Sequence, residues 1–219
     1  MNEILFIITI ILNFSSVFIA YKLFNKTGLF CLMVFATIVA NIEVVKCIDL
    51  FGMSLTLGNV MYGTVSLITD VLNEKYGSKT ARKSVYISFG TMLMFTLFMQ
   101  INLMFIPNSE DFASGAMKTL FAITPRICVA TLVAYLISNV LDTHIYDKLR
   151  KYKLWVRNNG STMISQFVDT IIFTFIAFYG VFSMNMLIEL IFTTYVIKIV
   201  IALIDTPVFY LLTTKLKKY

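Results

Sequence analysis

Long apolar stretches separated by short polar linkers run through the whole chain. A helix needs about 20 apolar residues to cross a bilayer. Runs of this kind cover residues of about 3–24, 29–50, 57–75, 84–106, 120–146, 162–183 and 186–213. The pattern predicts an all-α integral membrane protein: a bundle of about seven transmembrane helices in a single transmembrane domain, residues 1–219. The third run contains polar residues and glycines, so we expect it to be short, broken or partly re-entrant.

Composition agrees with this pattern. The chain is 58% hydrophobic and only 14% charged, with a mean hydropathy of +0.83, whereas about a quarter of the residues of a soluble domain are charged. Little chain remains for a separate soluble catalytic or nucleic-acid-binding domain, so no nucleic-acid partner is expected. The three cysteines are too scattered for a disulfide framework or a CxxC metal site.

Basic residues predict the orientation in the membrane. Of the 18 Lys and Arg residues, 14 lie on alternate linkers or the C-terminal tail: Lys22, Lys26, Lys75, Lys79, Arg82, Lys83, Lys148, Arg150, Lys151, Lys153, Arg157, Lys215, Lys217 and Lys218. Basic loops stay in the cytoplasm. We therefore expect a multi-pass protein of the cytoplasmic membrane, with its N-terminus outside and its C-terminus inside. The first run lacks a basic flank before it, which favours a retained helix over a signal peptide.

Six acidic side chains lie inside or at the ends of the apolar runs. They are Glu43, Asp70, Glu74, Asp142, Asp169 and Asp205. A charge at the centre of a bilayer costs roughly 3 kcal/mol or more, so such residues usually face a bundle interior or a water-filled cavity. This pattern indicates that the chain binds or moves a polar solute inside the membrane.

Polar residues recur at helical spacing in several runs. In the third run, Asp70, Asn73 and Glu74 share one face at i, i+3 and i+4. The fifth, sixth, seventh and second runs add Asn139 with Asp142, Gln166 with Asp169, Lys198 with Asp205, and Asn41 near Glu43 and Lys46. Tyr62, Phe167 and Tyr195 are candidates for stacking on a flat ligand.

Structural explanations compete with functional ones at these positions. Glu74 and Asp142 lie near basic linkers and could be solvated interface residues, and His144 fits an interfacial role better than catalysis. Asp169 and Lys198 lie near the centres of their runs, where an ion pair could simply fix helix packing. Asp205 precedes Thr206-Pro207 and could belong to a helix kink.

Motifs of soluble enzymes and ATPases are absent. The sequence has no HExxH, no Walker GxxxxGK[ST], no GxSxG and no cluster of His or Cys. We expect a protein that is not an enzyme, with no catalytic residues, no metal site and no cofactor.

Three segments, ITDVLNEKYG, YLISNVLDTHIYDKLR and SQFVDTIIFTFIAFYG, together resemble the queuosine precursor transporter family, also called the putative vitamin uptake transporter family. The resemblance spans roughly residues 29–213 and leaves residues 1–25 as an accessory helix. It implies import of 7-deazaguanine bases, namely 7-cyano-7-deazaguanine, 7-aminomethyl-7-deazaguanine or queuine, for tRNA modification. It also implies a six-helix core similar to the substrate-binding components of energy-coupling-factor vitamin transporters.

The resemblance selects a set of substrate-binding residues. The predicted set is Asn41, Thr69, Asp70, Asn73, Glu74, Asn139, Asp142, Gln166, Asp169 and Lys198. Gln166 stands where the family often has glycine, so its contact is the least secured. We expect Asp169 or Asp70 to accept from the guanine-like edge, the amides to contact the base, and Lys198 to neutralise an aspartate or donate to the ring carbonyl.

Other hypotheses remain open at this stage. The chain could be a substrate-binding component that requires a separate energy-coupling ATPase module. It could be a membrane-embedded enzyme that acts on a lipid or prenyl substrate through Asp142 and His144, or a passive scaffold. The expected partners are a small nucleobase and the lipid bilayer, with homo-oligomerisation left open.

Overall fold

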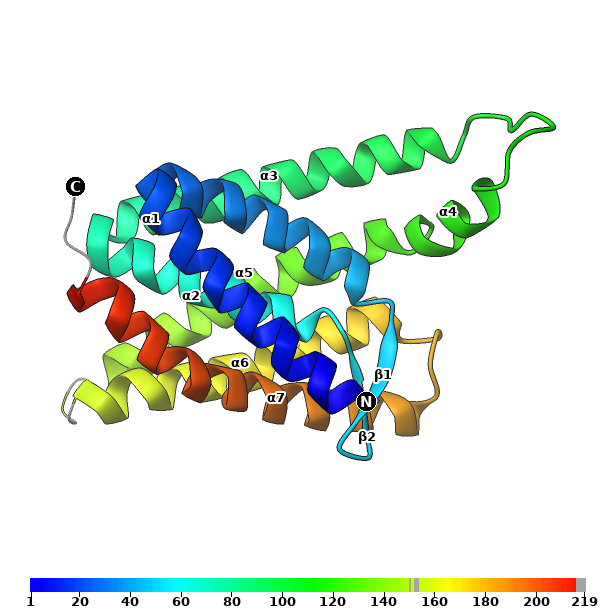
Figure 1. The fold of residues 1–219 in the computed structure, drawn as a ribbon. Coiled ribbons are helices and arrows are strands. Elements are labelled where there is room, and N and C mark those ends of the chain that lie inside the picture. Colours follow the sequence, from blue (N-terminus) through cyan, green and yellow to red (C-terminus); the bar gives the residue numbers. More distant parts are fainter. Residues whose placement is uncertain (150, 152–153, 216–219) are drawn as a thin grey trace.

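The computed structural model describes residues 1–149, 151 and 154–215, and it is almost entirely helical (Figure 1). The helices are α1 (Asn2–Glu43), α2 (Asn59–Tyr76), α3 (Ser78–Asn102), α4 (Ser114–Phe121), α5 (Thr124–Lys148), α6 (Leu154–Phe178) and α7 (Met184–Tyr210), followed by a π-helical turn, η1 (Leu211–Lys215). Two short strands, β1 (Cys47–Leu50) and β2 (Met53–Thr56), lie between α1 and α2.

Helix α1 folds back on itself at Asn25. This residue has φ 50° and ψ −132°, outside the helical region, and asparagine tolerates positive φ better than most residues. The side chain of Asn2 donates to the carbonyl of Asp49 at 2.8 Å, so the start of α1 lies beside the strand that follows its end. The predicted separation of the runs at 3–24 and 29–50 is therefore correct at this turn (Figure 1).

The sequence prediction is wrong at the end of the second run. The helix stops at Glu43, and residues 47–50 form a strand paired antiparallel with residues 53–56. Phe51 and Gly52 connect the strands with φ 52° and 77°, and two successive positive φ values are the feature of a type I′ hairpin turn. The fold is thus an all-α bundle with a small β-hairpin at one end.

Helix α2 occupies the middle of the bundle despite its lower hydropathy. It is a continuous helix of 18 residues, roughly 27 Å long, and it packs against α1, α3 and α7. Gly63 makes the approach of α7 close, since a Cβ there would lie 2.4 Å from a methyl group of Ile201. Of the forms expected for the third run, the structure therefore shows the short one, a helix without a break.

The first segment of α1 is attached to α2 by a buried lysine. Lys75 is only 5% exposed, and its ammonium donates to the hydroxyl of Tyr21 at 2.8 Å and lies 4.5 Å from the centre of that ring. A cation held over an aromatic face is stabilised by the ring quadrupole. Lys75 was assigned to a basic linker from the sequence, whereas the structure places it inside a helix.

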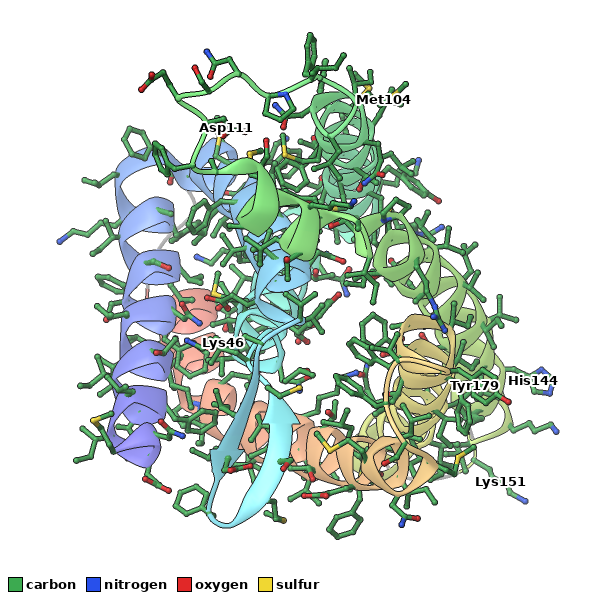
Figure 2. The ribbon with its side chains drawn as sticks, turned by 90° about the vertical axis from the view of Figure 1, so that its right-hand side faces the viewer. Lys46, Met104, Asp111, His144, Lys151 and Tyr179 are labelled. Atoms are coloured by element: carbon green, nitrogen blue, oxygen red, sulfur yellow. The ribbon has the colours of Figure 1, made fainter. Side chains whose placement is uncertain are left out.

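The remaining helices form a second group around an α5–α6 pair. These two helices pack along each other, α7 contacts both α6 and α2, and α5 also contacts α3. Figure 2 views the bundle from the hairpin end, with α1 at one edge and the α5–α6 pair at the other. The helical region that corresponds to the predicted fifth run begins earlier than residue 120, because residues 114–121 form helix α4.

The described part of the chain suits a membrane. Four helical stretches are long and apolar enough to cross a bilayer: Asn2–Glu43, Ser78–Asn102, Ser114–Ser138 and Met184–Thr213, and Met163–Phe178 is apolar but shorter. Large apolar side chains such as Ile4, Leu12, Phe98 and Ile188 are exposed, which a soluble monomer rarely shows over so wide a surface. The chain is a multi-pass membrane protein.

Charge separates the two ends of the bundle. The turn within α1, the α2–α3 junction and the end of α7 lie at one end, and the N-terminus, the hairpin and the α3–α4 connection lie at the other (Figure 1). Basic linkers that the sequence placed on one side of the membrane, those around residues 22–26 and 79–83, meet at the same end. Which end faces the cytoplasm stays a prediction from the positive-inside rule.

Candidate functional site

An ion pair links the two C-terminal helices. The ammonium of Lys198 on α7 lies 2.8 Å from Oδ2 of Asp169 on α6, and the two side chains are 19% and 20% exposed. Lys198 also donates to the hydroxyl of Thr170 at 3.2 Å, and the hydroxyl of Ser138 on α5 lies 3.2 Å from Oδ1 of Asp169. The predicted neutralisation of an aspartate by Lys198 is thus observed, with contacts from three helices.

A buried polar network lies between α1, α2 and α5. Asn41 is almost fully buried; its amide donates to the carbonyl of Thr37 at 2.7 Å, and its Oδ1 accepts from the hydroxyl of Thr131 at 3.2 Å. The hydroxyl of Tyr62 lies 3.4 Å from that of Thr131. Tyr62 is also within electrostatic range of Asp169, so this network and the ion pair face the same interior region.

One face of α2 carries accessible polar side chains. While its other face is buried, Tyr62, Ser66, Thr69, Asp70 and Asn73 are partly buried or exposed. Their spacing follows one side of a helix, and Tyr62 contacts α5 through Thr131. We call these five residues the α2 polar stripe.

Asp70 differs from Asp169 in its surroundings. It has no hydrogen-bond partner in the part of the chain that the structure describes, and it is exposed. The carboxyl group of Asp205 on α7 lies close enough to interact with it electrostatically. Asp205 lies two turns after Lys198, so α7 carries a cation that contacts α6 and, further along, a carboxylate close to α2. Glu74 is exposed at the end of α2, where a solvated role suffices.

The structure does not bring every predicted residue into one cluster. Gln166 is partly buried on α6, and its main-chain carbonyl accepts from Thr170. His144 is exposed and points away from the bundle in Figure 2. Asn139 and Asp142 belong to α5, but their side chains, and with Asp142 the pairing proposed with His144, are not among the side chains that the structure describes.

The stacking candidates have separate environments. Phe167 and Tyr195 pack edge to face with ring centres 5.1 Å apart, and the Tyr195 hydroxyl donates to the carbonyl of Met163 at 3.3 Å. These two rings therefore pack against each other, and the Tyr195 hydroxyl has its hydrogen-bond partner on α6. Tyr62 belongs to the α2 polar stripe and faces the interior, so it fits a ligand contact better than the other two.

Several polar contacts were not found from the sequence. Ser138, Thr170 and Thr131 complete the two networks, but isolated hydroxyl residues occur throughout apolar helices and give no pattern. Asn59 is similarly buried; its amide nitrogen contacts the carbonyl of Thr56 at 3.0 Å and the hydroxyl of Thr194 on α7 at 3.1 Å. The sequence signal for this contact was an asparagine at the start of the least apolar run.

Two cavities are distinguished by their lining. The larger, about 440 Å³, lies between the first segment of α1 and the end of α7, and Ser15 is the one polar residue among the described residues that line it. A second, about 190 Å³, is lined by Thr69 and Asn73 of the α2 polar stripe, together with residues of α3 and α5. Of the two, the smaller cavity adjoins the α2 polar stripe among the described residues. Among the described residues, no three His, Cys, Asp or Glu side chains gather to hold a metal.

A bundle of apolar helices with charged and amide groups in its interior is typical of integral membrane proteins that handle a polar solute, such as membrane transport proteins. The family described as "Putative vitamin uptake transporter" matches residues 56–212. The chain belongs to this family, whose members are transporters and not enzymes.

Curated relatives cover nearly the whole chain. It is 44% identical over 214 residues to the "Probable queuosine precursor transporter" of Bacillus subtilis (strain 168), covering 95% of this chain and 93% of that protein. It is 26% identical over 188 residues to the "Queuosine precursor transporter" of Escherichia coli (strain K12), covering 84% and 83%. No solved structure matches the chain, so the predicted likeness to energy-coupling-factor components stays a prediction.

Proposed function

We propose that this chain imports queuosine precursors, that is 7-deazaguanine bases, across the cytoplasmic membrane. The observation that carries the proposal is the 44% identity, over 95% of the chain, to a protein named as a probable transporter of these compounds. The polar groups inside the bundle support it, because a deazaguanine offers a donor edge, a carbonyl acceptor and a flat face. Each of these features has a counterpart among the residues around α2, α6 and α7.

We assign the donor edge of the base to Asp70. A guanine-like ring N–H and its exocyclic amine can pair with one carboxylate through two parallel hydrogen bonds. Both oxygens of Asp169 already have partners, Lys198 and Ser138, whereas Asp70 is accessible and unpaired within the described residues. Of the two aspartates expected from the sequence, Asp70 therefore suits this role better.

Lys198 is our candidate donor to the carbonyl of the base. An ammonium has three donors, and Asp169 and Thr170 engage two of them among the described residues. The third can be offered to a ring carbonyl without breaking the ion pair. Asp169 then keeps Lys198 charged and oriented, and Tyr62 supplies an aromatic face near both networks.

The proposed mechanism is alternating access around this interior site. The α1–α2–α3 group and the α5–α6 pair would move relative to each other, with α7 in contact with both α2 and α6. The end of the bundle with the basic linkers faces the cytoplasm in this proposal, following the positive-inside rule. The base would enter near the hairpin end and leave near the α2–α3 junction.

The test is queuosine content of tRNA in cells that neither make nor import deazaguanine bases. The host lacks energy-coupling modules, and each base is supplied in turn to cells that express the wild type, Asp70→Asn or the control Glu110→Gln, an exposed residue of the α3–α4 connection. We expect the wild type and Glu110→Gln to restore queuosine, and Asp70→Asn to reduce it at least tenfold at equal membrane expression.

Other outcomes would revise the proposal in defined ways. Restoration by the wild type only when an energy-coupling module is co-expressed would make the chain a substrate-binding component. No restoration with any base, with the protein present in the membrane, would contradict the proposed substrate. Full activity of Asp70→Asn would remove Asp70 from the site and leave the function standing.

A further inference from the structure

The cavity of about 190 Å³ is a pocket with polar lining residues at the basic end of the bundle. Thr69 and Asn73 line it from α2, Ser78 and Arg82 from α3, and Tyr135 from α5. It is smaller than the roughly 300–1,000 Å³ of pockets for drug-sized ligands. The size therefore suits a single bicyclic base better than a nucleoside or a nucleotide.

The groups that face this pocket favour a ligand edge rich in acceptors. Arg82 makes no ion pair within the described residues, and its guanidinium presents donors in a planar fork. Asn73 adds an amide, while the Thr69 hydroxyl already donates to the carbonyl of Val65 at 2.8 Å and offers its lone pairs. Among the side chains that the structure describes, no carboxylate lines the cavity. Its chemistry is thus the reverse of that at Asp70.

Tyr135 supplies a fixed aromatic wall. Its ring packs edge to face on Phe89 of α3, with ring centres 4.9 Å apart. A ring held in this way can receive a flat heterocycle at little additional entropic cost, and base–aromatic stacking is tolerant of the substituents on the base. The pocket therefore offers stacking and hydrogen bonds together.

The pocket is connected to the interior site in two ways. The α2 polar stripe leads from Tyr62 to Thr69 and Asn73, about 16 Å along one helix face. On α5, the hydroxyl of Ser138 lies 3.2 Å from the carbonyl of Tyr135 and 3.2 Å from Oδ1 of Asp169. One turn of α5 therefore separates the aromatic wall from the ion pair.

We propose that this pocket is a second base-binding subsite, facing the cytoplasm and occupied on release, in which Arg82 and Asn73 hold the acceptor edge and Tyr135 holds the flat face. The proposal rests on the proposed function. It adds a preference among substrates, because the positive charge of Arg82 repels a cationic 7-substituent. The neutral nitrile base should leave through this pocket more readily than the aminomethyl base, which is protonated at neutral pH.

The experiment measures transport by the full chain in proteoliposomes of known orientation. Labelled 7-cyano- and 7-aminomethyl-7-deazaguanine are presented separately from the outer face and from the basic, cytoplasmic face. The variants are Arg82→Gln, Tyr135→Leu and Tyr135→Phe, and the control is Lys83→Gln, an exposed neighbour outside the pocket. Melting temperature in detergent shows whether each variant is folded.

We expect Tyr135→Leu to raise the KM from the cytoplasmic face about tenfold, with the outer KM within twofold of wild type. Tyr135→Phe, which keeps the ring, should behave like the wild type and Lys83→Gln. Arg82→Gln should raise the cytoplasmic KM for the nitrile base about tenfold and that for the aminomethyl base by less, since losing the repulsive charge offsets part of the lost hydrogen bonding.

Three results would overturn the subsite. Cytoplasmic KM values of Arg82→Gln and Tyr135→Leu equal to that of Lys83→Gln would show that the pocket holds no base. Equal losses from both faces and for both bases in folded protein would show a structural role. A wild type that transports neither base would refute the proposed function itself, and the subsite with it, so the two failures are distinguishable.

Discussion

The ammonium of Lys198 on α7 and the carboxylate of Asp169 on α6 lie 2.8 Å apart, each about one-fifth exposed. This contact joins two helices that pack against each other. Removing one partner leaves a charge without a counter-charge in a membrane interior, whereas removing both leaves none. Stability and transport can therefore be separated at this pair.

Asp169→Asn alone should lower the free energy of unfolding by about 3 kcal/mol, because Lys198 is left uncompensated. The double variant Asp169→Asn with Lys198→Gln should recover most of that loss without recovering transport. Thermal unfolding in detergent, together with uptake, checks both statements. A double variant as unstable as the single one would show that geometry at this position matters more than charge.

The turn in α1 depends on glycine at position 28. A Cβ there would lie 2.2 Å from the carbonyl oxygen of Ala20, a backbone atom that cannot move independently. Gly28→Ala should therefore destabilise the protein by about 1–3 kcal/mol. Gly90→Ala on α3 is the matched control, since nothing lies within 4 Å of its Cβ position, and it should be neutral or stabilise by up to about 1 kcal/mol. Equal melting temperatures for the two variants would contradict the close packing at Gly28.

Arg126 closes the end of α6. Its guanidinium, on the first turn of α5, donates to the carbonyls of Ile176 and Tyr179, which are among the acceptors that a helix end leaves without partners. Arg126→Gln should lower the free energy of unfolding by about 1–3 kcal/mol. Arg126→Lys should recover only part, because an ammonium lacks the planar fork. Lys118→Gln, on the exposed α4, should leave the melting temperature unchanged.

The contacts of Asp111, on the α3–α4 connection, predict that local stability outside the membrane depends on pH. It accepts from the hydroxyl of Ser114 and from the backbone amides of Ala113 and Ser114, and these bonds hold its pKa below the ordinary value. A lowered pKa in the folded state gives stability that is present above the unfolded value, near 4, and lost as pH falls through the folded value.

Hydrogen-exchange protection at the start of α4 measures this effect. Protection of the Met117 amide, which donates to the carbonyl of Ala113, should decline below about pH 4 in the wild type. In Asp111→Ala, which has no acceptor for these amides, it should be low at every pH. A wild-type protection factor that stays constant from pH 6 to well below pH 4 would show that the cap does not hold the helix.

The fold could be predicted from the sequence where a run of apolar residues or a single linker determines the structure. Runs of about 20 apolar residues located most helices, and the linker at Lys22 and Lys26 marked the turn at Asn25. The pairing of Lys198 with Asp169 could also be anticipated, because two opposite charges near the centres of apolar helices have few other ways to be stabilised.

Sequence was insufficient where a partner comes from a distant element. The hairpin was missed because its turn, Phe51-Gly52, lacks the usual Asn-Gly signal. The contact of Asn59 with Thr194 spans 135 residues, and the pocket at Tyr135 requires three helices to be placed together. No local pattern encodes such distances, so the substrate-binding set from the resemblance remains a prediction to be tested by mutation.

The fold-back of α1 at Asn25 also bears on how the chain enters the membrane during synthesis. Its two segments contact each other at Gly28 and Ala20, so residues 2–43 can pair before the rest of the chain has been made. If the positive-inside rule sets the orientation, the basic turn stays on the ribosome side while the two segments insert. We therefore expect the first 43 residues to insert as one hairpin, on which α2 then assembles.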